Sequence, residues 1–381
     1  MKCQKNKFIL SGKKTYLNCA YMSPMLKKVE KAGIKGLKMK RAPYKIMPED
    51  FFNEVELLKK AYASLINTPE HERIAMVPSV SYGIANITNN IRLEKKDNVV
   101  LVGDQFPSNV YPWMELTKKY GAKLTFIQKP KQNNKTGELW NKEILKNINK
   151  NTKVVSMGLV HWADGTIFDI QKIRKKTKDV GSLLVLDGTQ SIGVMPFDNQ
   201  KTQPDALICA GYKWLLGPYG SGLAYYNSVF DNGKPIEESW VNRKNSEDFS
   251  NLINYEEEYG ELSKRYNMGQ QSNFITVSML KEGIKQINNW GVDNIYAYIK
   301  TITSSNFNLL DKSKVWYEEE PYRAAHLFGL KPKKNLKNIL KNIRKKNIFI
   351  SLRGETIRVS PSVYNKKEDV EKLFNCISKN I

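Results

Sequence analysis

The sequence predicts an α/β protein with a large domain on a mainly parallel sheet and a smaller α+β domain. Between about residues 75 and 230, short apolar strand-like runs alternate with helical stretches, which is the rhythm of βαβ units. From about Thr276 the pattern changes to long helices that end in two strands. Because a single apolar core stops growing near ~250–300 residues, a chain of 381 residues should hold more than one domain.

The predicted elements follow one another without an internal repeat or a low-complexity linker. A helix over 47–67 precedes the sheet, and strands are expected at 98–104, 123–128, 152–162, 182–188, 206–211 and 221–227. Helices are expected at 111–120, where Gly121 ends the helix, and at 171–181. Two strands at 348–354 and 356–364 and a terminal helix complete the chain. We therefore place the large domain at 16–280 and the small domain at 1–15 and 281–381.

The formal net charge of +23 is large enough to attract nucleic acid or an anionic membrane surface. A non-catalytic nucleic-acid-binding protein on this scaffold is therefore an alternative hypothesis. Against it, lysine occurs together with abundant Asn and Ile throughout, which indicates a bias of the whole sequence. The densest basic segment, 330–346, has the apolar spacing of one helix face, so its lysines are interpreted as the solvated side. Nucleic acid is not the expected partner.

The sequence contains no sign of a membrane span, a secretory signal or a metal site. No apolar run approaches the ~20 residues of a membrane-spanning helix. The basic segment 1–14 lacks the ~7–15 apolar residues of a signal peptide. The four cysteines lie far apart, without metal-site spacing. We expect a cytoplasmic protein with no membrane association and no structural metal.

Two polar residues at the ends of predicted strands carry the chemical prediction. Ligands of open α/β sheets bind beyond the carboxyl ends of the strands, where Asp187 and Lys213 follow the runs 182–186 and 206–211. Burial favours the neutral amine of a lysine, the form that attacks an aldehyde. A carboxylate opposite a pyridine ring keeps the ring nitrogen protonated. The pair predicts a pyridoxal 5'-phosphate (PLP) site, in which Lys213 holds the cofactor as a Schiff base.

Further residues near the strand ends would complete this site. Gln190 could donate a hydrogen bond to the phenolic oxygen of the ring. Ser79, Ser81 and the backbone at Val80 stand at the start of a predicted helix, whose free N–H groups and dipole suit a phosphate. Phe106 follows the strand at 98–104 and offers a flat apolar face for the ring.

Three other residues have a functional and a structural interpretation. Arg358 offers the bidentate fork that suits a substrate α-carboxylate, although Arg358 and Arg353 could equally be rim charges. His161, which precedes Trp162 at a predicted strand end, could touch the cofactor or be a structural histidine. Each of these candidate residues, taken singly, has an ordinary structural explanation. Their occurrence together, in order and at the ends of predicted strands, favours a functional site.

The motifs resemble those of the class V aminotransferase family of PLP enzymes. The most specific segment is PDALICAGYKWLLGPYGSGLAYY (204–226), which is similar to the family's lysine loop and glycine turn. Other similar segments, in the family's order, are 17–25, 104–113, 159–170, 186–198, 269–274 and 357–365. The resemblance implies the aspartate-aminotransferase-like fold, fold type I, with a seven-stranded sheet between helices and a smaller C-terminal domain.

The resemblance also implies roles for residues that the strand-end argument does not assign. Tyr212 would help Ser79 and Ser81 to hold the phosphate. The family's members are homodimers whose active sites borrow a phosphate contact from the neighbouring subunit, and Gln270 and Ser272 are the candidates for it.

The sequence departs from two branches of the family. The stretch SLRGET before Arg358 lacks the mobile cysteine of a desulfurase, and Cys376 lies in the terminal helix, which disfavours persulfide chemistry. DGTQSIG after Asp187 lacks the histidine of a kynureninase.

We expect an aminotransferase that acts on an amino acid or a related amine, because transamination needs no further catalytic group. A β-lyase or epimerase, of the selenocysteine lyase or isopenicillin N epimerase type, is the alternative.

Overall fold

The computed structural model describes residues 1–131 and 135–381, and its centre is a seven-stranded sheet. The strand order is β2-β8-β7-β6-β5-β3-β4. The strands are β2 (Ile74–Val77), β3 (Asn98–Val102), β4 (Lys123–Ile127), β5 (Thr152–Gly158), β6 (Leu183–Asp187), β7 (Ala206–Ala210) and β8 (Gly222–Tyr226). From β7 to β4 all neighbours are parallel, whereas β8 is antiparallel to both β7 and β2. The prediction of a mainly parallel sheet is confirmed.

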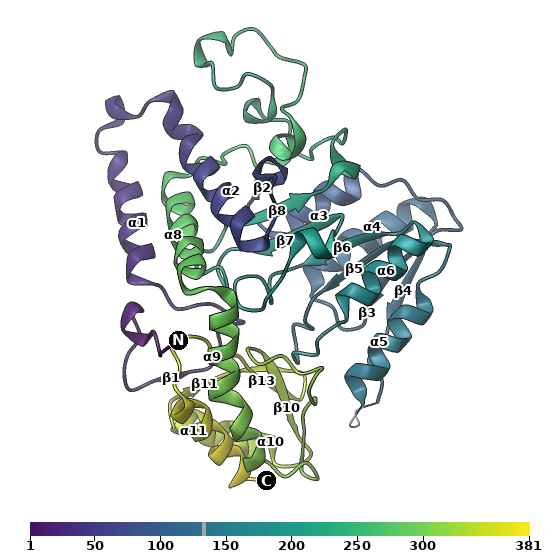
Figure 1. Ribbon diagram of the computed structural model, residues 1–381, viewed down its shortest axis with the longest axis vertical. Coiled ribbons are helices and arrows are strands. Elements are labelled where there is room, and N and C mark those ends of the chain that lie inside the picture. Colours follow the sequence, from purple (N-terminus) through teal and green to yellow (C-terminus); the bar gives the residue numbers. More distant parts are fainter. Residues whose placement is uncertain (132–134) are drawn as a thin grey trace.

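Helices cover both faces of this sheet, because successive strand residues point to opposite sides. Val99 and Leu101 of β3 belong to one core cluster, and Val100 and Val102 belong to the other. Figure 1 shows the helices on either side of the strands. They are α1 (Lys27–Met39), α2 (Asn53–Ile66), α3 (Val80–Asn89), α4 (Tyr111–Tyr120), α5 (Thr136–Asn147), α6 (Ile170–Val180), the short α7 (Asn199–Thr202) and α8 (Phe274–Trp290).

A separate core cluster holds the C-terminal part of the chain together. Its antiparallel sheet has the order β12-β13-β10-β9, and β1 pairs in parallel with β11. The strands are β1 (Thr15–Tyr16), β9 (Val315–Trp316), β10 (Phe328–Pro332), β11 (Ile348–Phe349), β12 (Ser351–Arg353) and β13 (Thr356–Val359). The helices are α9 (Val292–Ser304), α10 (Leu336–Lys345) and α11 (Lys367–Ser378). This part lies below the large sheet in Figure 1, with α9 leading down to it.

Two predictions about the C-terminal part can be compared with the structure. Ile339 and Ile343 of α10 are buried, while Lys337 and Lys341 on the other face are exposed, which confirms the interpretation of these lysines as the solvated side. The predicted division between residues 280 and 281 falls inside α8, and both α8 and α9 contribute to the core of the large sheet. The exact division of the chain into domains therefore stays a prediction.

No helix among residues 1–131 and 135–381 is both long and apolar enough to cross a bilayer.

Candidate active site

A cavity of about 220 Å³ lies where the carboxyl ends of β6 and β7 meet the first turn of α3. Parallel strands end at the same edge of the sheet, which is why residues distant in sequence converge here. Eight of the predicted site residues line the cavity, namely Ser79, Val80, Ser81, Phe106, Asp187, Gln190, Tyr212 and Lys213. Structure adds lining residues that the sequence analysis did not assign, namely Pro78, Ser108, Trp162, Thr189, Ala210, Tyr219, Gly220 and Ser221.

The first turn of α3 forms one end of the cavity. Ser79 is the N-cap residue, and its Oγ accepts a hydrogen bond from the backbone N–H of Tyr82 at 3.2 Å. The hydroxyls of Ser79 and Ser81 lie 2.9 Å apart. Gly83 lets the helix approach β7 closely, since a Cβ there would lie 2.9 Å from Ile208 Cγ2. Free backbone N–H groups and two hydroxyls at a helix N-terminus suit a phosphate group.

Lys213 projects into the cavity from the segment that follows β7. Its side chain is 6% exposed, and its Nζ lies 5.4 Å from the ring centre of Phe106 and 5.3 Å from that of Tyr212. Burial lowers the pKa of this amine to about 8, although the nearby Asp187 carboxylate opposes the shift. An amine with such a pKa spends part of its time neutral near physiological pH, as a nucleophile for an aldehyde must.

Asp187 ends β6 and presents its carboxylate to the same cavity. Oδ1 accepts a hydrogen bond from the backbone N–H of Thr189 at 3.0 Å. Burial raises the pKa of this carboxyl, and the Thr189 contact and the positive charge of Lys213 act in the opposite direction. A protonated pyridine nitrogen would give this buried carboxylate a further hydrogen bond and a further positive charge.

The amide of Gln190 is held in place by two neighbours. Its Nε2 donates to the backbone oxygen of Ala20 at 3.1 Å, and its Oε1 accepts from Trp214 Nε1 at 2.9 Å. An amide nitrogen carries two hydrogens, so one donor remains for a ligand oxygen. The predicted role of Gln190 as a donor to the cofactor's phenolic oxygen is thus compatible with its contacts.

Aromatic rings form the walls of the cavity. Phe106 and Trp162 meet edge to face with ring centres 5.3 Å apart, and Tyr212 and Tyr219 lie 4.6 Å apart. Trp162 Nε1 donates to the backbone oxygen of Asp104 at 2.6 Å, which fixes the indole. Aromatic walls of this kind suit a planar conjugated ring.

His161 does not reach this cavity in the structure. Its ring is 3% exposed and packs against Trp140 with ring centres 5.0 Å apart. Nδ1 lies 3.1 Å from Asp164 Oδ1, and Nε2 lies 3.2 Å from the backbone oxygen of Asp104. Trp162, the next residue along the chain, stands in the turn that follows and lines the cavity instead.

Arg358 lies in a second cavity of about 240 Å³ that adjoins the first. The two cavities share five lining residues, Phe106, Trp162, Tyr212, Lys213 and Tyr219. Arg358 is 1% exposed, and its Nη1 donates to the backbone oxygen of Trp162 at 3.0 Å. Burial lowers the pKa of this guanidinium to about 9. The predicted carboxylate-binding residue is thus next to the predicted cofactor site.

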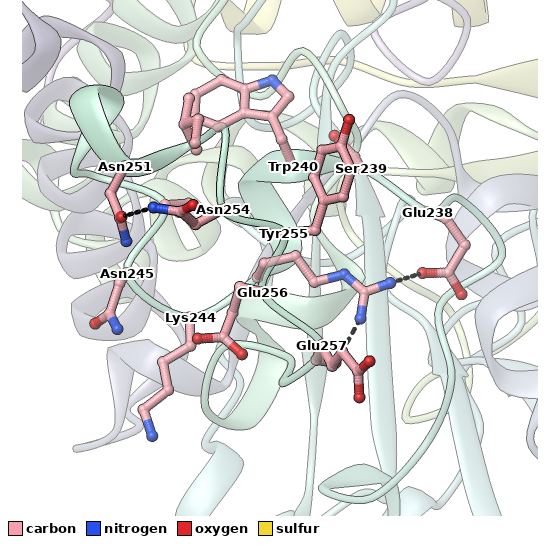
Figure 2. A pocket seen from close by; sticks show the side chains of 13 residues that line it. Glu238, Ser239, Trp240, Lys244, Asn245, Asn251, Asn254, Tyr255, Glu256 and Glu257 are labelled. Carbon is pink, nitrogen blue, oxygen red and sulfur yellow. Dashed lines mark hydrogen bonds and ion pairs between the residues drawn. The ribbon is translucent and has the colours of Figure 1, made fainter.

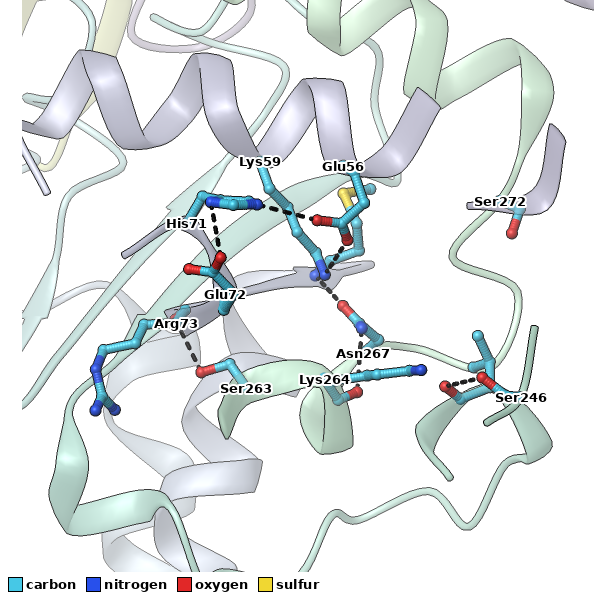
Figure 3. A network of polar contacts seen from close by, with 12 residues as sticks. Glu56, Lys59, His71, Glu72, Arg73, Ser246, Ser263, Lys264, Asn267 and Ser272 are labelled. Carbon is cyan, nitrogen blue, oxygen red and sulfur yellow. Dashed lines mark hydrogen bonds and ion pairs between the residues drawn. The ribbon is translucent and has the colours of Figure 1, made fainter. Parts of the chain in front are cut away.

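Gln270 and Ser272 do not line either cavity of their own chain. The segment before them runs along the edge strand β2, where Ser263 Oγ donates to the Arg73 backbone oxygen at 2.8 Å. Asn267 Oδ1 accepts from the backbone N–H of Met76, also at 2.8 Å. Figure 3 shows this network beside α2. Gln270 is exposed and Ser272 Oγ donates to the Phe51 backbone oxygen, so their role toward a second subunit stays a prediction.

A larger cavity of about 620 Å³ lies in the segment that follows β8 and contains no predicted site residue. Figure 2 shows side chains of its lining, including Tyr255, which is exposed. Arg243 pairs with Glu238 at 2.6 Å. Its charged groups are of both signs and largely exposed. It shares no residue with the two cavities around Lys213.

Some lining residues that were not predicted lie next to predicted site residues in the sequence, and this position could have identified them. Thr189 stands between Asp187 and Gln190, directly after a buried strand, and its Oγ accepts from the Ala210 backbone N–H at 3.1 Å. Tyr219 and Ser221 flank Gly220, whose φ of +81° forms the turn into β8. Hydroxyl and aromatic residues in a glycine turn next to the predicted lysine were candidates by position alone.

Taken together, these residues define a PLP-dependent enzyme of fold type I. The buried amine, the buried carboxylate, the aromatic walls and the helix N-terminus match the aldehyde, ring nitrogen, ring and phosphate of this cofactor.

Comparison with known proteins gives the family. The profile of the aminotransferase class-V family matches residues 43–373, and the chain belongs to this family. An uncharacterized aminotransferase of Bacillus subtilis is 25% identical over 337 residues, covering 87% of this chain and 85% of the relative. A probable cysteine desulfurase of Pyrococcus abyssi is 29% identical over 262 residues, covering 68% of this chain and 62% of the relative.

Solved structures agree with the fold. The apo cysteine desulfurase of Thermococcus onnurineus superimposes with a TM-score of 0.84 at 22% identity, covering 100% of this chain and 98% of that one. A complex of the cystine C–S lyase C-DES with cysteine persulfide has a TM-score of 0.84 at 16% identity, covering 97% and 98%. The protein is a PLP-dependent enzyme, an aminotransferase or a related lyase.

Proposed function

We propose that the protein is an aminotransferase that acts on an α-amino acid, with Lys213 as its acid–base group and Arg358 as its carboxylate site. The observation that carries the proposal is the adjacency of the two cavities, which share Lys213. One cavity has the groups that would hold PLP, and the other has a buried guanidinium with an unpaired Nε. An α-amino acid spans these two sites with its amino and carboxylate groups.

When bound, PLP supplies a conjugated system that stabilises negative charge at the substrate's α-carbon. Asp187 would hold the ring nitrogen, Gln190 the phenolic oxygen, and Ser79 and Ser81 the phosphate. Lys213 Nζ is neutral in roughly a tenth of molecules at pH 7, given its pKa of about 8. It therefore can take the proton from the α-carbon as a general base. Phe106 and Trp162 line both cavities beside Lys213.

The cysteines support aminotransfer rather than desulfuration through an enzyme persulfide. No cysteine lines either cavity among the residues that the structure describes. Burial raises the pKa of the Cys19 thiol to about 12 and also raises that of Cys209. A thiol accepts sulfur as the thiolate, so these two buried thiols are poorly suited to the task.

A β-lyase is the second candidate, and a specific observation favours it. Relatives of this chain are named probable cysteine desulfurases, and the similar structure of C-DES is named a cystine C–S lyase. Elimination needs only a base at the α-carbon and a leaving group on the substrate, so the same Lys213 would serve.

A screen of amino acids against the purified holoenzyme tests both candidates. An aminotransferase turns over only while a keto acid acceptor is present and releases a new keto acid. A β-lyase releases ammonia without any acceptor. Keto acids would be identified by mass spectrometry and ammonia by a coupled assay. Ammonia release that is independent of an acceptor would overturn the aminotransferase proposal, and no response to any amino acid would overturn both.

A further inference from the structure

The cavity that holds Arg358 also contains a second arginine, Arg353. Both come from the β12–β13 hairpin, in which Ser351 is opposite Arg358 and Arg353 is opposite Thr356. The cavity is lined by three groups that carry positive charge, Lys213, Arg353 and Arg358, and by no acidic residue. Its other walls are aromatic or apolar, so the bound ligand meets a positive field.

Neither guanidinium has an acidic partner among the described residues. Arg358 Nη1 donates to the Trp162 backbone oxygen at 3.0 Å and Nη2 to Ser351 Oγ at 3.4 Å. Arg353 Nη1 donates to the Leu352 backbone oxygen at 2.8 Å. The Nε of each arginine is buried and has no hydrogen-bond partner. Donors therefore remain on both groups.

The two charges are close enough to disfavour each other. Their central carbons lie 5.3 Å (Arg353) and 5.9 Å (Arg358) from the centre of the same Trp162 ring. Burial lowers the pKa of Arg358, and the positive charge of Arg353 lowers it further. The indole face offers partial compensation by a cation–π contact, but like charges side by side call for an anion. A single α-carboxylate carries one negative charge and leaves the second guanidinium uncompensated.

We propose that Arg353 binds a second anionic group, on the side chain of the substrate, while Arg358 binds the α-carboxylate. The substrate class is therefore an α-amino acid with an acidic side chain, such as a carboxylate. This inference rests on the proposed function, because it assumes an amino acid whose α-amino group reaches Lys213. Arg353 is a specificity-determining residue, since it discriminates acidic from neutral side chains through a charge-assisted hydrogen bond.

Steady-state kinetics of the holoenzyme with matched acid and amide substrates test this assignment. L-aspartate and L-glutamate would be compared with L-asparagine and L-glutamine, which have the same shape and no side-chain charge. The proteins are the wild type, Arg353→Gln, Arg353→Lys and Arg358→Gln. Arg344→Gln is the control for net charge, because Arg344 is exposed on α10 and lines neither cavity.

The wild type should prefer the acids, with a KM at least about tenfold below that of the amides. Arg353→Gln should raise the KM of the acids about tenfold or more and change that of the amides by less than about twofold. Arg353→Lys should restore part of the preference, because the charge returns without the bidentate fork. Arg358→Gln should raise the KM of acids and amides alike, and Arg344→Gln should alter neither.

Different outcomes separate the inference from the proposed function. If Arg353→Gln raised the KM of acids and amides equally, Arg353 would share the α-carboxylate and the inference would fall. If the wild type did not prefer acids and Arg353→Gln changed no KM, the inference would also fall while the proposed function stood. If no amino acid of either kind altered the absorbance of the holoenzyme, the proposed function itself would be overturned. The absorbance of each variant reports whether it retains its cofactor and hence its fold.

Discussion

The lysine that we assign to the cofactor should destabilise the protein when the cofactor is absent. Lys213 is 6% exposed, and burial lowers its pKa from 10.5 to about 8. Protonation of Lys213 at pH 7 therefore favours the unfolded chain. Below pH 8, a pKa shift of this size lowers the free energy of unfolding by ~3 kcal/mol. Lys213→Met has a similar shape and carries no charge, so the apoprotein of this variant should be more stable than the wild type at pH 7.

The pH dependence has a definite sign. The folded-state pKa is below the unfolded one, so between about pH 8 and 10.5 the unfolded chain binds more protons than the folded one. The stability of the wild type should then rise with pH in this window relative to the variant. The difference of ~3 kcal/mol at pH 7 should shrink to about 1 kcal/mol at pH 10.

Urea titrations of the two apoproteins at pH 7 and pH 10, at one protein concentration, would measure both quantities. Thermal unfolding at pH 7 should also shift upward by ~4 °C for a chain of this length. Equal stability at pH 7 would show that Lys213 carries no buried charge. A difference that stayed constant up to pH 10 would show that the amine does not titrate in the window given above. Either result would refute the reasoning.

Three other predictions address the cofactor site and its framework. Borohydride reduction of the holoenzyme should attach the cofactor to the peptide that contains Lys213, and a label on another lysine in the mass spectrum would contradict this. Asp187→Asn should fold, because burial already raises the pKa of that carboxyl, yet lower kcat by at least about a hundredfold in steady-state assays; a normal kcat would refute its role. Gly83→Ala should lower the free energy of unfolding by about 1–3 kcal/mol in urea, since its Cβ would press on Ile208. Gly12→Ala, with open space around it, is the matched control.

Residues whose positions follow from a local apolar pattern lie in the structure where that pattern predicts them. The strand at 206–210 is a continuous apolar run that ends shortly before Lys213, and the strand at 183–187 ends on Asp187. Because parallel strands share one carboxyl edge, their terminal residues meet without any knowledge of the loops. The helix 111–120 was likewise predicted with its terminal Gly121, whose φ of +64° only glycine adopts readily.

Orientation at the end of a strand was harder to predict than the position of that end. His161 and Trp162 both follow β5, and periodicity alone does not say which of them faces the ligand. The structure turns His161 toward Asp164 and Trp140 and leaves Trp162 at the cavity. The register of a short irregular segment depends on hydrogen bonds to other parts of the chain, such as the one from Trp162 to the Asp104 backbone.

Local sequence pattern is enough to predict the α/β class and to place a carboxylate and an amine at the ends of two apolar strands. The distant segments that complete the site come together only in the folded chain. Arg353 and Arg358 meet Trp162 although about 190 positions separate them, and Ala20 fixes the amide of Gln190. Apolar periodicity and strand ends are local properties, whereas the second cavity forms only where the C-terminal hairpin meets Ala20, Phe106 and Trp162.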